Sequence, residues 1–229
     1  MSEAPEVLTE VDGNVLIVTI NRPEARNAVN GDVAAGLDAA ITQTEADEDT
    51  WVVILTGVGN DAFSAGADLK AVSGGNGHLL RTARGGFAGF VHAPRTKPWI
   101  AAVTGPALAG GCELALACDM IVASDDSRFG LPEVKRGLFA AAGGVHRLPR
   151  ALPRAIALEL IATGEPMDVA RAHGFGLVNY VVPNEQVRDR ALALARAIAV
   201  NAPLSVRESL KLARLAQELS DGEMRERSR

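Results

Sequence analysis

The chain has 229 residues and a net charge of −5, a size that suits one large α/β domain with a helical extension. Hydrophobic residues make up 48% and charged residues 22%, which excludes disordered and fibrous classes. Basic residues do not cluster and no apolar run reaches membrane-spanning length, so we expect neither nucleic acid nor membrane as a partner. Glu3 and Glu6 stand where a secretory signal is basic, so we expect a cytoplasmic protein.

Four short apolar runs, rich in β-branched residues and bounded by turn formers, predict strands that are buried on both faces. They lie at 16–20, 52–55, 100–103 and 120–123. Between the first two, apolar residues recur at helical spacing after Asn30, a candidate N-cap. This alternation of strand, helix and strand predicts parallel pairing with helices packed outside.

Beyond Arg150 the pattern is mainly helical, with one short strand at 177–182. The predicted helices lie at 154–162, 168–173, 185–200 and 203–219. The last one carries an apolar stripe that needs a surface to cover it, which we expect another subunit to provide. The stripe consists of Leu212, Leu215, Ala216 and Leu219.

The two cysteines, Cys112 and Cys118, lie on one predicted helix and point to different faces, so we expect free thiols rather than a disulfide. No Cys or His pair has the spacing of zinc ligands. We therefore expect no metal site.

A first candidate motif follows the second strand and reads Phe63-Ser64-Ala65-Gly66-Ala67-Asp68-Leu69-Lys70. Its run of small side chains would let a ligand approach the backbone. The alternative interpretation is tight chain packing, with Asp68 as the cap of a following helix.

A second candidate motif places Gly110 and Gly111 at the start of a predicted helix after the third strand. The free amides and positive dipole at such a start suit a developing oxyanion. A dinucleotide site is disfavoured because the G-x-G-x-x-G spacing is absent. Glu113 follows one turn later in an otherwise apolar helix, so we expect a buried carboxylate; the alternative is a surface charge that stabilises the helix dipole.

A third candidate is Glu133, twenty residues beyond Glu113. The strand at 120–123 can return the chain to the same cleft, and two carboxylates there can handle a proton and a water together. The alternative is a salt bridge to Lys135 or Arg136.

Four segments together resemble the crotonase (enoyl-CoA hydratase/isomerase) superfamily over residues 7–182. They are Asn21-Arg22-Pro23, Ser64-Ala65-Gly66-Ala67-Asp68-Leu69, Ala109-Gly110-Gly111-Cys112-Glu113-Leu114-Ala115 and Phe129-Gly130-Leu131-Pro132-Glu133. The resemblance implies an α/β fold, a spiral of ββα repeats with a helical C-terminal region, assembled as a homotrimer or a dimer of trimers. We expect a spiral core at 1–190 and a helical region at 191–229 that is shorter than is usual in the family.

The resemblance also implies roles for individual residues. It gives oxyanion-hole amides at Ala67 and Gly110, and a general acid/base pair at Glu113 and Glu133. The implied substrate-binding positions are Ala25, Ala65, Ala67, Asp68, Leu69, Lys70 and Gly110.

The implied reaction is the reversible syn hydration of a trans-2-enoyl-CoA, with no metal or redox cofactor because coenzyme A is part of the substrate. Alternatives are another acyl-CoA dehydratase or isomerase, or a catalytically weak acyl-CoA-binding subunit. The segment 85–90 resembles carnitinyl-CoA dehydratases in particular. The chain reads Ala140-Ala141-Ala142-Gly143-Gly144 where hydratases commonly have Pro-Gly-Ala-Gly-Gly, so we expect a shifted backbone there.

Overall fold

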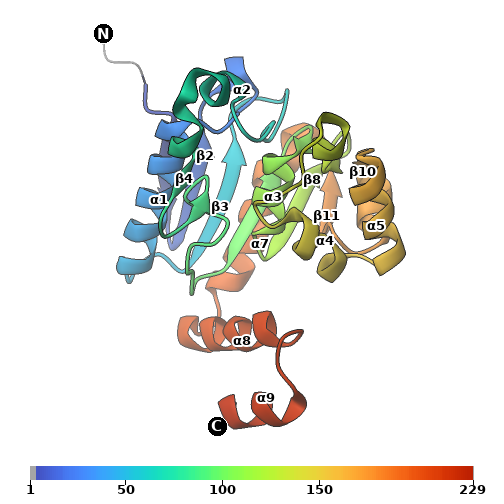
Figure 1. The fold of residues 1–229 in the computed structure, drawn as a ribbon. Helices are drawn as coiled ribbons and strands as arrows, with labels where there is room; N and C mark the ends of the chain where they lie inside the picture. The colour runs from blue at the N-terminus through green and yellow to red at the C-terminus, as the bar shows by residue number, and fades with distance from the viewer. Residues whose placement is uncertain (1–3, 229) are drawn as a thin grey trace.

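The computed structural model describes residues 4–228 and is built around a six-stranded sheet of order β1-β2-β3-β6-β8-β11 (Figure 1). Its strands are β1 (Val7–Asp12), β2 (Val15–Ile20), β3 (Val52–Gly57), β6 (Trp99–Val103), β8 (Met120–Ser124) and β11 (Tyr180–Val182). The five strands from β2 to β11 pair in parallel, as predicted, whereas β1 pairs antiparallel with β2. The strand expected at 177–182 forms only over its last three residues.

Helices cover both faces of the central part of this sheet, which explains why β2, β3, β6 and β8 are almost entirely apolar, whereas β1 at the edge is mostly exposed. Alternate residues of β2 divide between two cores: Leu16 packs with the buried face of α1 (Gly31–Ala46), and Ile17 packs with α7 (Val187–Ala199). The Asn30 side chain accepts a hydrogen bond from the Val33 amide, which confirms the predicted N-cap.

The remaining helices are α2 (Leu69–Ala71), α3 (Gly110–Leu116), α4 (Gly144–Ala151), α5 (Arg154–Thr163), α6 (Val169–Gly174), α8 (Pro203–Leu215) and α9 (Asp221–Arg227). Short helical turns lie at Pro23–Ala25, Val72–Asn76, Gly77–Leu80, Pro132–Arg136 and Asn184–Gln186. Within 4–228, no helix is long and apolar enough to cross a membrane.

A second, smaller sheet positions the candidate residues. Its order is β10-β9-β7, with β10 (Met167–Asp168), β9 (Arg128–Gly130) and β7 (Ala107–Leu108). The strand β7 runs directly into α3, and β9 runs directly into the turn that carries Glu133. Because β7 and β9 pair in parallel, they lead the chain in the same direction. A two-stranded hairpin of β4 (Arg81–Thr82) and β5 (Gly86–Phe87) lies between β3 and β6 in the chain.

The C-terminal helices α8 and α9 project from the body of the molecule (Figure 1). Neither helix has a buried residue, and the apolar stripe at 212–219 is only partly covered by the described part of the chain. The predicted boundary between residues 190 and 191 falls inside α7, whose Ala191 and Leu192 are buried against the sheet. Residues 1–3 and 229, the outer ends of the two predicted parts, lie outside the described residues.

Candidate active site

The two small-residue segments, 64–68 and 107–111, pack backbone against backbone. The Leu108 amide donates to the Ser64 carbonyl at 3.2 Å, and a Cβ atom on Gly111 would lie 2.0 Å from that same oxygen. A Cβ atom on Gly66, which has a φ of +84°, would lie 2.6 Å from the Gly110 nitrogen. Glycine at these positions is therefore required by the closeness of the two chains.

This packing places two free amide donors near one another. Among residues 4–228, neither the Ala67 N–H nor the Gly110 N–H donates to any protein acceptor. Gly110 begins α3, so its amide is one of the unpaired donors of the first helical turn. The preceding Ala109 has a φ of +52°, an uncommon conformation for alanine, and it directs the chain into this helix.

An ion pair fixes the segment that carries Ala67. The Arg22 guanidinium donates to the Asp68 carboxylate at 2.9 Å, and the same carboxylate accepts hydrogen bonds from the amides of Lys70 and Ala71. The interpretation of Asp68 as a helix cap is therefore confirmed. Sequence reasoning gave no role to Arg22, although a basic residue beside a proline in one of the four motifs was the available signal.

The other predicted substrate-binding positions lie along the edge of this segment. The Ala65 amide donates to the Arg26 carbonyl at 3.0 Å, which brings half-buried Ala25 close to exposed Ala65. The side chains of Leu69 and Lys70 are exposed. These residues therefore form an exposed surface rather than an enclosed pocket.

Glu113 is a buried carboxylate, as expected from its apolar helix, with 3% of its surface exposed. Its Oε1 atom accepts a hydrogen bond from the Gly144 amide at 2.8 Å. Burial raises the pKa of Glu113 to about 7, and the charge of Glu133 acts in the same direction. The amides of Gly144 and Ala142 and the cation of Arg147 oppose this rise.

Glu133 is half-buried in its helical turn, and burial raises its pKa as well. Its Oε2 atom is buried and has no hydrogen-bond partner among the described residues. The alternative of a salt bridge to Lys135 or Arg136 is wrong: Lys135 pairs with Glu165 at 2.6 Å, and within residues 4–228 Glu133 forms no ion pair with either residue. The structure thus brings two carboxylates with raised pKa values within electrostatic reach of one another.

The segment 140–144, which carries three alanines, donates to Glu113 through the Gly144 amide. The expected shift of its backbone relative to hydratases stays a prediction. A Cβ atom on Gly144 would lie 2.8 Å from the Leu131 side chain, so the loop packs closely on the strand end that leads to Glu133. The hydrogen bond from the Gly144 amide to the Glu113 carboxylate places the backbone of this loop against the carboxylate.

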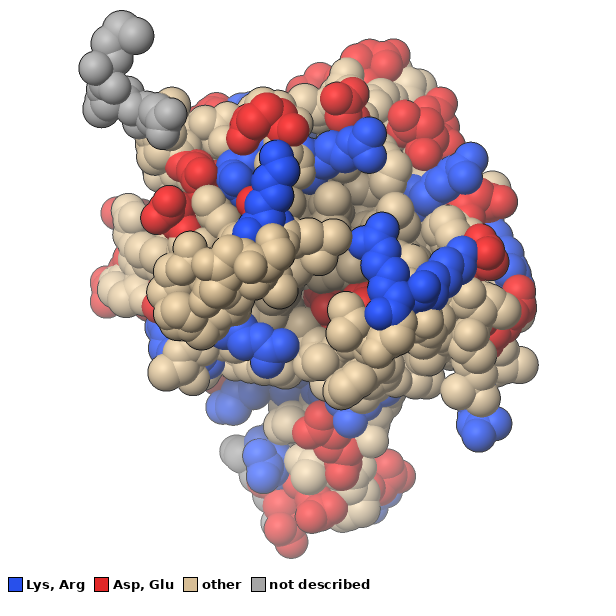
Figure 2. Space-filling view, turned by 45° about the horizontal axis from the view of Figure 1, so that its top comes forward, with Lys and Arg blue, Asp and Glu red and all other residues tan. Residues whose placement is uncertain are grey.

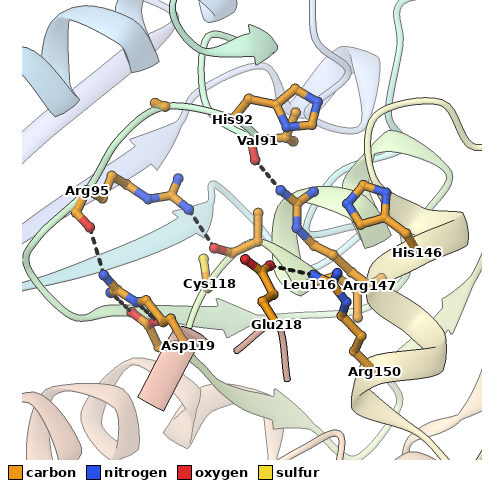
Figure 3. Close-up of a pocket in the computed structure, with 13 residues that line it drawn as sticks. Val91, His92, Arg95, Leu116, Cys118, Asp119, His146, Arg147, Arg150 and Glu218 are labelled. Carbon is orange, nitrogen blue, oxygen red and sulfur yellow. Dashed lines mark hydrogen bonds and ion pairs between the residues drawn. The ribbon is translucent and has the colours of Figure 1, made fainter. Parts of the chain in front are cut away.

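The face that Figure 2 presents is hollowed near its centre, with an acidic side chain visible in the depression and Lys and Arg side chains around it. A separate cavity of about 470 Å³ lies beyond the C-terminal end of α3 (Figure 3). It is lined by neither Glu113 nor Glu133, and several basic side chains from α4 and from the segment after β5 point toward it.

The chain is similar to known proteins over almost its whole length. The family model described as enoyl-CoA hydratase/isomerase matches residues 10–227. A probable enoyl-CoA hydratase of Mycobacterium bovis is 42% identical over 225 residues, which cover 96% of this chain and 86% of that protein.

Two solved structures are also similar to the chain. The crystal structure of an enoyl-CoA hydratase from Mycobacterium tuberculosis H37Rv has a TM-score of 0.94 and 48% identity, covering 98% of this chain and 88% of the other. A carnitinyl-CoA dehydratase from Mycobacterium avium 104 has a TM-score of 0.87 and 51% identity, covering 96% and 85%. These likenesses confirm the predicted fold class.

The raised pKa of Glu113 predicts a pH-dependent cost to stability. Between the ordinary value of 4.5 and about 7, the folded chain binds more protons than the unfolded chain, so the free energy of unfolding falls as pH rises. The cost reaches about 3 kcal/mol above neutral pH. Glu113→Gln should therefore gain stability over the parent between about pH 5 and about pH 8 in urea unfolding.

The matched control is Glu159→Gln, at an exposed glutamate whose pKa is lowered by its hydrogen bond with Arg171. This variant should show no such gain, because a lowered pKa stabilises the folded chain at high pH. Equal pH slopes for the Glu113→Gln variant and the parent would contradict the prediction.

Proposed function

Because this chain belongs to the enoyl-CoA hydratase/isomerase family, we propose that it catalyses the reversible syn hydration of a trans-2-enoyl-CoA to a 3-hydroxyacyl-CoA. One arrangement carries the proposal. The backbone amides of Ala67 and Gly110, which have no protein acceptor among residues 4–228, lie near two carboxylates with raised pKa values, Glu113 and Glu133.

The amides act on the thioester carbonyl. When water oxygen bonds to C3, the electron pair of the C2–C3 double bond moves toward the thioester oxygen, which gains negative charge. Two donors already aimed at that oxygen stabilise the charge without reorganisation. The absence of a side chain at Gly110 lets the Phe87 ring and the Gly66 backbone pack closely against the start of α3.

The carboxylates manage the proton and the water. One ionised carboxylate accepts a proton from the attacking water, and one protonated carboxyl delivers a proton to C2. Two neighbouring carboxyl groups with raised pKa values are suited to share this single proton near neutral pH. Neither step calls for a metal or redox cofactor, since coenzyme A arrives with the substrate.

The similarity to the Mycobacterium avium carnitinyl-CoA dehydratase supports a second candidate within the same chemistry. An isomerase would need only one of the two carboxylates, and a binding subunit would need neither. A spectrophotometric screen against enoyl-CoA esters of increasing length, including crotonobetainyl-CoA, separates these candidates. Absence of turnover with every ester would contradict the proposal.

Replacing either carboxyl group by an amide should abolish the proton transfer. Gln is nearly isosteric with Glu and its oxygen can still accept the Gly144 hydrogen bond, so Glu113→Gln and Glu133→Gln should fold. Each should lower kcat by about 10²-fold to 10⁴-fold in the hydration assay. Glu159→Gln serves as the control with parental activity, and near-parental turnover in either site variant would remove that residue from the mechanism.

The amide of Ala67 can be removed without altering a side chain. Incorporation of lactic acid at position 67 replaces the N–H by an ester oxygen, and we expect kcat/KM to fall by about 10²-fold to 10³-fold. The melting temperature should stay close to that of the parent, because this N–H has no protein acceptor among the described residues. Unchanged kcat/KM would show that the thioester oxygen does not bind there.

We also propose that the chain assembles as a homotrimer or a dimer of trimers. The partly covered stripe, which begins on α8 and continues past its end at Leu215, supports this, since an apolar face of that length needs a partner surface. Light scattering should give three copies or a multiple of three. Leu215→Lys should shift the protein toward smaller species, whereas Lys211→Gln, on the exposed side of α8, should not; a monomeric parent at micromolar concentration contradicts the proposal.

A further inference from the structure

Arg147, on the first turns of α4, holds the loop that donates to Glu113. Its guanidinium donates to the Ala142 carbonyl at 3.1 Å. It also donates to the Val91 carbonyl at 2.5 Å (Figure 3). A Cβ atom on Gly143 would lie 1.8 Å from an Arg147 nitrogen, so glycine at 143 leaves the space that the guanidinium fills. One side chain thus ties the loop at 140–144 to the segment that ends at Val91.

That segment also reaches the other half of the site. Phe87 lies four residues before Val91, and the Val91 amide donates to the Phe87 carbonyl. A Cβ atom on Gly110 would lie 2.5 Å from the Phe87 ring. Arg147 therefore connects the loop at 140–144, which donates to Glu113, with the segment at 87–91, which packs against Gly110.

The charge of Arg147 has no carboxylate hydrogen-bond partner in the described part of the chain. Burial lowers its pKa, and the Glu113 carboxylate opposes that effect. Two other cations, Arg95 and Arg150, lie around it. Two histidines, His92 and His146, have pKa values that burial lowers. Burial raises the pKa of the Cys118 thiol to about 12. Glu113, which also faces Glu133 and the neutral thiol of Cys112, is the anion that balances Arg147.

We propose that Arg147 is a positioning residue for Glu113: it holds the loop whose Gly144 amide binds the carboxylate, and it supplies a positive charge beside it. This inference rests on the proposed hydration, because that is the reaction in which Glu113 must sit correctly and change its protonation. The two parts of the role, geometry and charge, can be separated by substitution.

Arg147→Met removes both parts, and Arg147→Lys keeps the charge but cannot reach two carbonyls with one planar group. In Arg147→Met, kcat should fall on the order of 10²-fold through misplacement of Glu113. The acid limb of the kcat/KM profile should also move to higher pH, since loss of a neighbouring cation disfavours the ionised carboxylate. In Arg147→Lys the limb should stay near its parental pH while kcat remains lowered.

The matched control is Arg150→Met, on the same helix. Its guanidinium pairs with Glu218 and makes no hydrogen bond to the loop at 140–144 in the described part of the chain. It should leave kcat and the acid limb close to parental. A folded Arg147→Met variant with the parental acid limb overturns the charge role, and an Arg147→Lys variant with parental kcat overturns the geometric role. If Arg147→Met does not fold, the Lys variant still tests the geometry.

A readout without substrate separates this proposal from the hydration itself. The infrared titration of the Glu113 carboxyl, taken as the difference between each protein and its Glu113→Gln counterpart, should have a higher midpoint in Arg147→Met. A moved midpoint in a protein that hydrates no ester supports the role of Arg147 and overturns the proposed function. Hydration by the parent with an unmoved midpoint overturns the charge role of Arg147 and leaves the proposed function standing.

Discussion

The site depends on the contact between two stretches of backbone, 64–68 and 107–111. There is no space for a Cβ atom at Gly66 or Gly111, because each would fall within 3 Å of an atom of the other stretch. This contact determines where α3 begins, and therefore where its first amide and, one turn later, its carboxylate lie. The ion pair between Arg22 and Asp68 holds the first stretch in place, and the pairing of β7 with β9 holds the second.

Burying a pair of carboxyl groups is unfavourable for stability, and the surroundings compensate only in part. The Gly144 amide and the Arg147 cation lower the pKa of Glu113, but burial and Glu133 outweigh them, so the pKa stays near neutrality. A fully compensated carboxylate would titrate too low to exchange a proton at neutral pH. Because burial is only partly compensated, the two carboxyl groups can exchange a proton near neutral pH. The loss of stability is tolerated because the rest of the fold, with helices on both faces of the sheet, is stable enough.

Much of this arrangement could be predicted from local sequence. The N-cap at Asn30 and the burial of Glu113 follow from short patterns, since an N-cap and an apolar helix depend on neighbours in the chain. The antiparallel β1 was not predicted because most of its side chains are exposed, which removes the apolar signal. Arg147 was not predicted because its partner carbonyl at Val91 lies 56 residues away, and no spacing rule indicates which carbonyl an arginine reaches. The sequence also does not predict the conformation of Ala109, since alanine rarely adopts a positive φ.

The attachment of α8 to the body has a consequence for solution conditions. Arg214 joins this helix to the Asp119 carboxylate at 2.8 Å and to the carbonyls of Arg95 and Lys97, while α8 buries no residue of its own. An attachment made of charges and hydrogen bonds at the surface is weakened by salt, whereas the apolar packing of α7 is strengthened by excluded salts such as sulfate. Added sulfate therefore weakens the attachment of α8 while it strengthens the packing of α7, so the choice of salt controls how firmly the C-terminal helices are held.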